Sequence, residues 1–429
     1  MVLYASLFLI AVAGGYIGKV NRTGRRRAIY LATVAAVLIF LAACRSENIG
    51  ADTLQFTTAY RTFAAESWHD ALSHGYEKGF LFLCRLLACI SPSPQLLIIF
   101  TSVFSIGVFM LVLYRNSRDV VMSVALFIGM QYYANYMNYM RQVLAITIAF
   151  LAIEFLLKKF RFGWIPYLAA VLLAATFHLT VLILCVLPLF YYLRPTRRLC
   201  CAAGALGLAA FILFNLLIRL AVWLFPKYRP YIGGEYLGGG GGESFLGITV
   251  CLAVFLSLLW VVFFRKTAGA VTGEQTPESS ELPELPEVTE VTKTAEATGT
   301  SATPEASESG VSEASEASAT PEATERSDAP APAAAYGAGY LFWCSFASLV
   351  LETLVLRAIV MGRLSFYFRM YATMSVPLFL ASLPRKGARI VRIAVLCLAL
   401  AHCILVLCYR QNWTQVAPYE FFWSATTGA

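Results

Sequence analysis

A few carboxylates, one histidine and several arginines beside apolar stretches are the side chains of this sequence that could take part in chemistry. Asp52 follows Gly50 just after an apolar run, and the glycine lets the backbone turn and hold the carboxylate close to the end of that run. His178 lies at the junction of two later apolar runs. A carboxylate or an imidazole can accept a proton as a general base, whereas arginine binds phosphate oxygens through paired hydrogen bonds.

A second group of polar residues surrounds Arg141 at the start of another apolar run. Asn135, Asn138 and Gln142 are spaced i, i+3 and i+7, which predicts that they share one face of a helix. An arginine beside an apolar span normally faces the protein interior or a wet cavity and needs an anionic partner. We expect Asp52 or a bound phosphate to be that partner.

Two further groups combine arginine with tyrosine. Arg363, Tyr367 and Tyr371 are spaced i, i+4 and i+8, which predicts one helix stripe, and Arg369 lies close by. An interfacial girdle of arginine and tyrosine is the alternative explanation, because such residues often mark the edge of a membrane.

The other group is Arg229 and Tyr231, which precede the five glycines of 238–242. This pattern is typical of a substrate-contact loop and equally of a merely flexible connection. A phosphate-binding P-loop is not predicted, because no Gly-Lys-Ser/Thr follows the glycines.

The loop after the second apolar run carries the remaining candidates, Arg45, Tyr60 and Glu77, together with Asp52. It spans residues 45–94 and holds five of the eleven acidic residues that lie outside an acidic segment described below. An ordinary polar surface loop is the alternative interpretation for much of it.

The composition fixes the kind of scaffold that must position these residues. Of 429 residues, 59% are hydrophobic and only 14% are charged, whereas soluble chains carry about 25% charged residues. These values exclude an ordinary soluble enzyme, a disulfide-rich secreted domain and a fibrous repeat. We expect an all-α polytopic membrane protein.

The net charge of +8 conceals two opposite parts. Residues 267–337 contain thirteen Glu and one Asp against Lys293 and Arg326, a net charge of −12, so the rest of the chain carries +20. The acidic part is rich in Pro, Ser, Thr and Ala, and such a composition cannot bury enough apolar surface to fold alone. We therefore expect a membrane domain over 1–264, a disordered acidic linker over 265–337 and the last part of the membrane domain over 338–429.

Apolar runs predict about twelve transmembrane helices. They lie near residues 2–18, 28–44, 95–114, 119–135, 142–157, 163–178, 179–193, 200–225, 246–264, 338–357, 365–383 and 389–409. The run 77–91 is shorter and more charged, so we expect a re-entrant or interfacial helix there. Glu154 and Glu352 are the acids inside predicted spans. We expect Glu154 to pair with Lys158, whereas the sequence does not assign the partner of Glu352, for which an arginine such as Arg357 is a candidate.

The positive-inside rule gives the orientation. Lys19, Arg22 and Arg25–Arg27 follow the first run instead of preceding it, which excludes a signal peptide and places this loop in the cytoplasm. The later basic turns then also fall in the cytoplasm, provided that 77–91 does not cross. Both termini are predicted outside, the linker 265–337 inside, and the polar groups around Asp52, Arg141, His178 and Arg363 outside.

The cysteines and histidines indicate no metal site. The eleven cysteines lie in or beside apolar runs, without a Cys-x-x-Cys pair or a zinc-like spacing to histidine. We expect buried, unpaired cysteines and no cofactor. A divalent metal is neither indicated nor excluded by these patterns.

Four short motifs in order resemble the EpsG family of Wzy-like exopolysaccharide and capsule polymerases. They are Ile49-Gly-Ala-Asp-Thr53 with Tyr60 following, Glu77-Lys-Gly-Phe80, Asn138-Tyr-Met-Arg-Gln-Val-Leu-Ala145 and Phe177-His-Leu-Thr180. The stretch Arg363–Arg369 resembles a later arginine and tyrosine segment of the family. Lys78 stands where the family pattern has proline, and the acidic segment is an insertion relative to the family.

The resemblance implies polymerisation of polyprenyl-diphosphate-linked oligosaccharide repeats at the outer face of the bacterial inner membrane. It also implies a GT-C-like fold, in which the catalytic acid commonly lies in the first outer loop. On this basis Asp52 is the first candidate base, His178 the second, and Glu77 a third catalytic candidate. Arg141, Arg363 and Arg229 would hold the diphosphate, and the substrate-binding set is completed by Arg45, Tyr60, Asn138, Gln142, Tyr231, Tyr367 and Arg369.

Other functions remain open for this set of residues. An outer-leaflet ligase or a single-sugar transferase would use the same arginines, and a flippase for lipid-linked oligosaccharide would need charges along a cavity through both leaflets. A membrane O-acyltransferase would rest on His178 alone. A flippase and a chain-length regulator are candidate partners besides the lipid bilayer, whereas nucleic acid is not.

Overall fold

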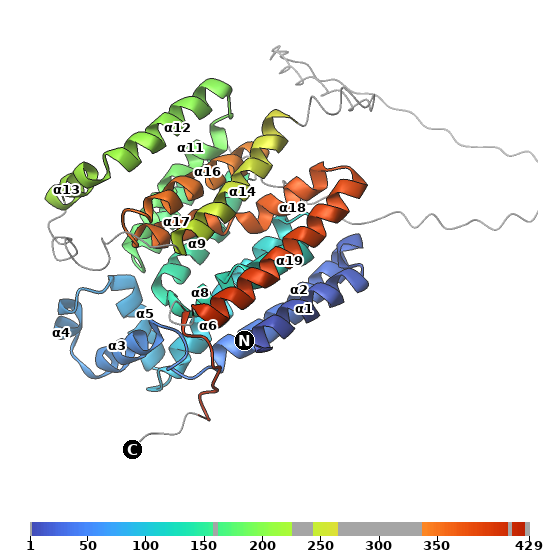
Figure 1. Ribbon diagram of the computed structural model, residues 1–429. Coiled ribbons are helices and arrows are strands. Elements are labelled where there is room, and N and C mark those ends of the chain that lie inside the picture. The colour runs from blue at the N-terminus through green and yellow to red at the C-terminus, as the bar shows by residue number, and fades with distance from the viewer. Residues whose placement is uncertain (1, 158–161, 225–242, 265–336, 411–413, 425–429) are drawn as a thin grey trace, which may run out of the picture. The chain divides into compact units, whose positions relative to one another are not determined.

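The computed structural model describes residues 2–157, 162–224, 243–264, 337–410 and 414–424, which belong to one compact unit (Figure 1). The described residues form helices and, apart from an isolated bridge between Arg45 and Phe421, no β-structure. The helices are α1 (Val2–Ile17), η1 (Val20–Arg22), α2 (Gly24–Ala43), α3 (Thr53–Ala65), α4 (Trp68–Ser73), α5 (Lys78–Ala88), α6 (Gln95–Asn116), α7 (Val120–Gly129), α8 (Tyr132–Asn138), α9 (Met140–Leu157), α10 (Trp164–Ala175), η2 (Leu179–Val186), α11 (Leu187–Tyr192), α12 (Arg197–Ile212), α13 (Phe214–Leu224), α14 (Glu243–Phe263), α16 (Ala338–Leu354), α17 (Met361–Arg369), α18 (Ala372–Ser382) and α19 (Arg385–Tyr409).

The all-helical prediction is confirmed for these residues, and each predicted apolar run overlaps a helix or a pair of short helices. The predicted number of twelve spans is not confirmed. Among the described helices, α2, α6, α9, α14 and α19 are long and apolar enough to cross a membrane, and the bent pair α12–α13 would make a sixth. The other apolar helices have 10 to 17 residues, fewer than the ~20 that a straight span needs.

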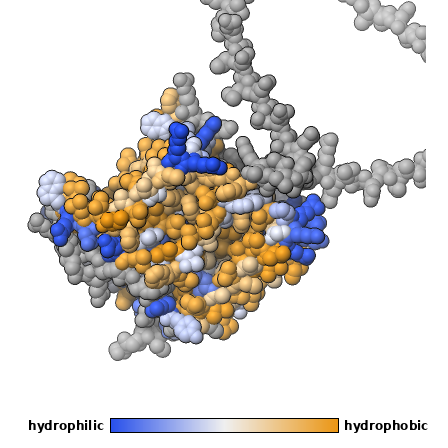
Figure 2. Space-filling model, turned by 45° about the horizontal axis from the view of Figure 1, so that its top comes forward, coloured by the Kyte–Doolittle hydropathy of each residue, from blue (hydrophilic) through white to orange (hydrophobic). Residues whose placement is uncertain are grey.

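Apolar side chains cover the outside of the unit as well as its core. Leu172, Leu206, Leu216, Ile390 and Leu398 are each at least 60% exposed, and Figure 2 shows apolar residues over most of the visible face with hydrophilic ones towards its edges. Soluble monomers rarely expose such large apolar patches, whereas a bilayer requires them. The protein is therefore embedded in a membrane.

Among the predicted runs that divide into two helices, two carry polar residues of the predicted groups. The run 119–135 divides into α7 and α8 at Gln131, whose φ of +60° is left-handed, and the run 365–383 divides into α17 and α18 after Arg369. A further break, at Tyr139, separates α8 from α9. The prediction of one continuous helix face through Asn135, Asn138 and Gln142 is therefore wrong, and so is the single stripe from Arg363 to Tyr371, because both cross a break.

Several predicted cytoplasmic turns meet at one end of the bundle. Arg27 donates hydrogen bonds to the carbonyls of Tyr114 and Ser117, and Arg392 lies 3.6 Å from Asp119 at the start of α7. Arg115 pairs with Glu154 at 2.7 Å. The predicted partner Lys158 lies outside the described residues, so Glu154 has an ion-pair partner that the sequence did not suggest.

The loop after α2 and the short helices α3, α4 and α5 lie at the other end, at the lower left of Figure 1. Residues 414–424 run along this loop. The amide of Gly50 donates to the carbonyl of Gln415, and the amide of Ser46 donates to that of Glu420. The loop is thus held by a segment far away in the sequence.

Helix α5 fits the predicted non-spanning segment 77–91. Its eleven residues would rise only ~16 Å, about half of the ~30 Å hydrocarbon core. Phe80 and Cys84 are buried against α3 and α6, whereas Phe82 and Leu86 are exposed. The predicted linker 265–337 lies outside the described residues except for Gly337, which precedes α16.

Candidate functional site

Asp52 is placed by a tightly constrained turn. Gly50 has a φ of +102°, which glycine adopts without strain, and a Cβ there would lie 2.5 Å from Oγ1 of Thr53 and 2.7 Å from Oδ1 of Asn138. The same Asn138 oxygen accepts a hydrogen bond from the amide of Ala51 at 2.9 Å. Both conformation and space therefore require glycine, and Asn138, predicted to bind substrate, instead anchors the loop that carries Asp52.

The carboxylate of Asp52 faces an arginine from the far end of the chain. Oδ2 accepts a hydrogen bond from Arg363 at 3.2 Å, and the guanidinium of Arg363 also lies 5.0 Å from the centre of the Tyr139 ring. Asp52 occupies the N-cap position of α3 but makes no capping bond. The side chain of Arg363 is 47% exposed, and pairs exposed in this way add little stability. Arg363 can therefore exchange Asp52 for another anion at low cost.

A second carboxylate–arginine pair forms at the start of α5. Glu77 accepts a hydrogen bond from Arg141 at 2.5 Å and another from the amide of Leu179 at 3.2 Å. Nδ1 of His178 lies 3.4 Å from Oε1 of the same carboxylate. The expectation that Asp52 pairs with Arg141 is therefore wrong, because Glu77 takes that place.

Close backbone contact holds Glu77 against the junction of α10 and η2. The amide of Gly79 donates to the carbonyl of Thr176 at 2.8 Å, and a Cβ at Gly79 would lie 2.3 Å from the Thr176 hydroxyl oxygen. Only glycine allows this approach. The glycine of the Glu77–Phe80 motif thus brings the carboxylate to His178.

Three aromatic rings surround the Arg141 guanidinium. The ring centres of Tyr76, Phe56 and Phe80 lie 4.7, 5.4 and 5.8 Å from it, within the range of cation–π attraction. The sequence did not identify Tyr76 or Phe56 as part of the site. The available signal was the i, i+4 spacing of Tyr76 and Phe80 on either side of Glu77.

Burial raises the pKa of Glu77, but the His178 ring and the Arg141 charge lower it by more, so that the pKa falls to about 2. The Glu77 carboxylate is therefore ionised at neutral pH. Such a group holds cations well and is a poor proton donor.

Two hydrogen bonds connect the two pairs. The side-chain amide of Gln142, next to Arg141, donates to the carbonyl of Arg363 at 2.6 Å. Thr180, two residues after His178, shares a hydrogen bond of 2.8 Å with the hydroxyl of Tyr367, one turn after Arg363 on α17. Asp52, Glu77, Arg141, His178 and Arg363 therefore form one cluster, which we call the acid–arginine cluster.

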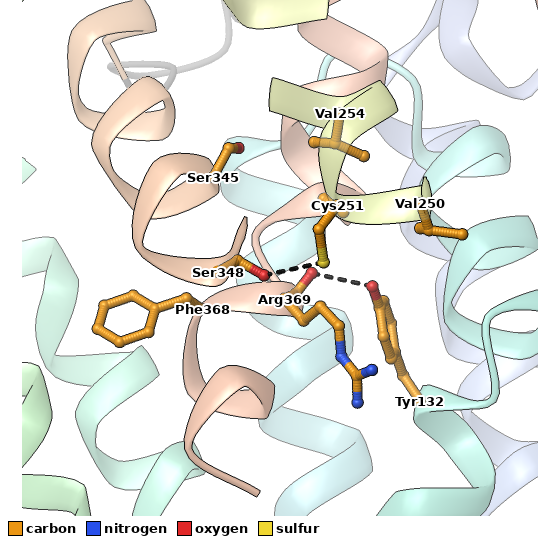
Figure 3. Close-up of a pocket in the computed structure, with 9 residues that line it drawn as sticks. Tyr132, Val250, Cys251, Val254, Ser345, Ser348, Phe368 and Arg369 are labelled. Atoms are coloured by element: carbon orange, nitrogen blue, oxygen red, sulfur yellow. Dashed lines mark hydrogen bonds between the residues drawn. The ribbon is translucent and has the colours of Figure 1, made fainter. Parts of the chain in front are cut away.

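Arg369 lies behind this cluster. It pairs with the buried Glu352 at 3.3 Å, and Tyr132 donates to its carbonyl at 2.9 Å. Figure 3 shows it beside a small cavity in which Cys251 and Ser348 are hydrogen-bonded. The volume of about 10 Å³ holds about one water molecule, so this cavity is too small for a sugar.

The partner of Glu352, which the sequence left unassigned with Arg357 as a candidate, is Arg369. The guanidinium of Arg357 lies 5.2 Å from the ring centre of Phe211 instead. Arg363 and Arg369 lie on the same helix α17, six residues apart, so they point in different directions, Arg363 to Asp52 and Arg369 to Glu352 on α16.

Two other predicted residues lie inside the fold. Arg45 is 1% exposed and donates to the carbonyls of Ala42 and Met137 and to the hydroxyl of Ser102. Tyr60 is fully buried, and its hydroxyl donates to the carbonyl of Ser91. Both side chains join helices to loops at this end of the bundle. Arg229 and Tyr231 lie outside the described residues.

No group of three or more potential metal ligands occurs among the described residues.

The comparisons with known proteins agree with the resemblance seen in the motifs. No curated protein and no solved structure matches the chain. Residues 28–270, more than half of the chain, match the EpsG family. This match includes Asp52, Glu77, Arg141 and His178. The chain belongs to the EpsG family.

Proposed function

We propose that the chain polymerises polyprenyl-diphosphate-linked oligosaccharide repeats into exopolysaccharide or capsule at the outer face of the bacterial inner membrane. Membership of the EpsG family implies a Wzy-like polysaccharide polymerase. The details of this proposal are carried by the acid–arginine cluster, because it combines two carboxylates, each 21% exposed, with two arginines at one end of the bundle.

The proposed reaction is a glycosyl transfer. A hydroxyl of one lipid-linked repeat attacks the anomeric carbon of the growing glycan on its polyprenyl diphosphate. A new carbon–oxygen bond forms, the bond to the diphosphate breaks, and the diphosphate leaves with the electron pair. The hydroxyl proton passes to a general base, for which Asp52 is our first choice.

The Asp52–Arg363 pair suits this step because both partners can be released together. When a diphosphate oxygen takes the guanidinium of Arg363, the Asp52 carboxylate becomes available to the acceptor hydroxyl. Arg363 then stabilises the negative charge that develops on the leaving group. Substrate binding and activation of the base are thereby coupled through an ion pair at 3.2 Å.

Glu77 is better suited to positioning than to proton transfer. Its low pKa keeps it ionised, and its oxygens already contact Arg141, His178 and the amide of Leu179. We propose that Glu77 orients Arg141 towards the diphosphate and fixes the His178 ring. His178 remains the second candidate base.

The proposed orientation rests on the distribution of charge. The turns that contain Arg27, Arg115 and Arg392 meet at the end opposite the acid–arginine cluster. Basic turns favour the cytoplasm, so the cluster would face outwards together with both termini, and the linker 265–337 would lie inside. A flippase and a chain-length regulator of the same pathway are the protein partners that we propose.

The test compares Arg363→Ala with Arg61→Ala in an assay of chain extension with purified protein and lipid-linked repeats. Both arginines are about half exposed, and each pairs with one carboxylate of the loop after α2, Arg61 with Glu47 at 2.8 Å. We expect Arg363→Ala to lower the rate by about 10²–10³-fold and Arg61→Ala to leave it unchanged. Full activity of Arg363→Ala would refute the proposal.

The length distribution of the products separates polymerisation from its nearest alternatives. A polymerase yields a ladder of many lengths, whereas a single-sugar transferase adds one unit. A flippase yields no longer product at all. A ladder that disappears in Arg363→Ala supports the proposal, and one added unit from the wild-type protein contradicts it.

A further inference from the structure

An open groove separates α1 from α2 at some distance from the acid–arginine cluster. α1 packs against α7, and α2 packs against α6, so the two helices lie next to each other without closing the space between them (Figure 1). Tyr30 reaches across with a hydrogen bond to the carbonyl of Ala11. The groove encloses about 440 Å³, within the usual size of ligand sites.

The lining of the groove is apolar and follows one stripe on each helix. The α1 side is formed by Leu7, Ile10, Ala11, Gly14 and Gly18. The α2 side runs from Arg26 to Leu38 through Ile29, Tyr30, Thr33, Val34 and Val37. The helix rises ~18 Å over the twelve steps from Arg26 to Leu38. This length is close to the ~15 Å of acyl chain in one leaflet of a bilayer.

Arg26 gives the groove a charged end. It lines the groove one turn before Ile29, and Arg22 and Arg25 are exposed nearby. None of these three arginines forms an ion pair within the described part of the chain. By contrast, Arg27 is engaged by the carbonyls of Tyr114 and Ser117. The end of the groove thus offers positive charge that the protein itself leaves uncompensated.

We propose that this groove binds an anionic glycerophospholipid of the membrane, with one acyl chain along α1 and α2 and the phosphate on Arg26. An apolar channel one leaflet long fits the chain, and the arginines are complementary to the head group. Basic pockets between transmembrane helices bind anionic lipids in this way. The site is separate from the proposed reaction, so its test does not depend on activity.

The chain offers matched variants for both halves of the site. Gly14 lines the groove and a Cβ there would meet nothing within 4 Å, so Gly14→Leu places its side chain in the groove. Gly107 on α6 is equally open and does not line the groove, so Gly107→Leu is its control. For the head group, Arg26→Ala is compared with Arg198→Ala, because Arg198 is also exposed and lies at another basic turn, at the start of α12.

The experiment measures the rise in unfolding temperature of the full-length protein in neutral detergent during titration with phosphatidylglycerol or phosphatidylcholine of identical acyl chains. Ligands that bind only the folded state raise this temperature. For the wild-type protein, Gly107→Leu and Arg198→Ala, we expect phosphatidylglycerol to bind at least about fivefold more tightly, equivalent to about 1 kcal/mol. Arg26→Ala should bind both lipids alike, and Gly14→Leu should lose the response to both.

Several outcomes would overturn the proposal. They are equal binding of the two lipids by the wild-type protein, a preference that survives Arg26→Ala, and an undiminished response of Gly14→Leu. Native mass spectrometry of the same samples counts the bound lipids. A dimer that Gly14→Leu dissociates would assign the groove to a second copy of the chain. Displacement of phosphatidylglycerol by equimolar polyprenyl phosphate would assign the groove to the carrier lipid instead.

Discussion

Asp52 and Asp119 occupy the same position in their helices and use their carboxylates in opposite ways. Each is the N-cap residue of a helix that follows a loop. Asp119 accepts a hydrogen bond from the amide of Met122, another from Asn21 and a third from Tyr16. Asp52 caps nothing and faces Arg363. An N-cap carboxylate normally accepts a hydrogen bond from the first turn of its helix, whereas the Asp52 carboxylate is directed to an arginine.

Glu77 makes the comparison more informative. It is also an N-cap residue without a capping bond, at the start of α5. Neither N-cap acid of the acid–arginine cluster makes a capping bond, whereas the carboxylate of Asp119, at the opposite end of the bundle, accepts hydrogen bonds that hold neighbouring elements together. The difference separates a carboxylate that caps its helix from two carboxylates whose partners are the side chains of arginines.

The largest effect is expected for Asp52→Asn. We expect chain extension to slow by about 10²–10⁴-fold, because a general base is lost. The free energy of unfolding should change by less than about 0.5 kcal/mol, because no capping bond is removed. Rate measurements and thermal unfolding of the same preparation provide the two values. A variant that is active, or that is inactive only because it unfolds, would break the comparison.

Glu77→Gln should destabilise the fold by about 1.5–3 kcal/mol at neutral pH, because a hydrogen bond between charged groups is lost. The folded-state pKa of Glu77, about 2, lies below the ordinary value of 4.5. The stabilisation is therefore complete above pH 4.5 and disappears as the pH falls towards 2.

The measurement for Glu77 is the difference in unfolding free energy between wild type and variant from pH 7 to 3. Glu47→Gln serves as the control, since its exposed pair with Arg61 contributes at most about 1 kcal/mol. A difference that stays constant down to pH 3, or that is absent at pH 7, would contradict the assignment.

Asp119→Ala is the complement of Asp52→Asn. We expect a loss of about 1–2 kcal/mol of stability, the usual cost of removing a capping side chain. The rate of chain extension per folded molecule should stay the same, because Asp119 lies at the other end of the bundle. Loss of that rate with unchanged stability would reverse the roles of the two aspartates.

The smallest effect is expected for Tyr367→Phe, which removes the hydrogen bond to Thr180 that connects the halves of the cluster. Its cost should be about 0.5–1.5 kcal/mol. A double-mutant cycle with Thr180→Val isolates the energy of the pair. A coupling energy of zero would show that the two carboxylate–arginine pairs act independently.

The sequence predicts the members of the site better than their partners. Asp52, Arg141, His178 and Arg363 were predicted for one end of the bundle, because each adjoins a boundary of an apolar run, and run boundaries are readable from composition. The partner of Arg141 could not be predicted, because Asp52 and Glu77 lie in the same loop and both are more than 60 residues away from Arg141 in the sequence. Only the contact between Gly79 and Thr176 places Glu77, and not Asp52, beside Arg141.

Helix breaks explain most of the errors in the fold. Gln131 adopts a left-handed conformation without being a glycine, so the division of α7 from α8 left no mark in the sequence. The break at Tyr139 likewise separates Asn138, which anchors the Asp52 loop, from Gln142, which binds α17. Arg45, predicted from the sequence to bind substrate, is buried in the fold, because an arginine at the end of a span can be buried when backbone carbonyls surround it.

The segment 414–424 has a consequence for the synthesis of the protein. The turn that carries Asp52 donates backbone hydrogen bonds to carbonyls of this segment, and Tyr4 in α1 donates to the carbonyl of Val416, 412 residues later. A nascent chain that has already inserted its first helices therefore cannot complete this turn. The turn around Asp52 gains these hydrogen bonds only after residue 420 has left the ribosome, so a chain that stalls earlier would reach the membrane without them.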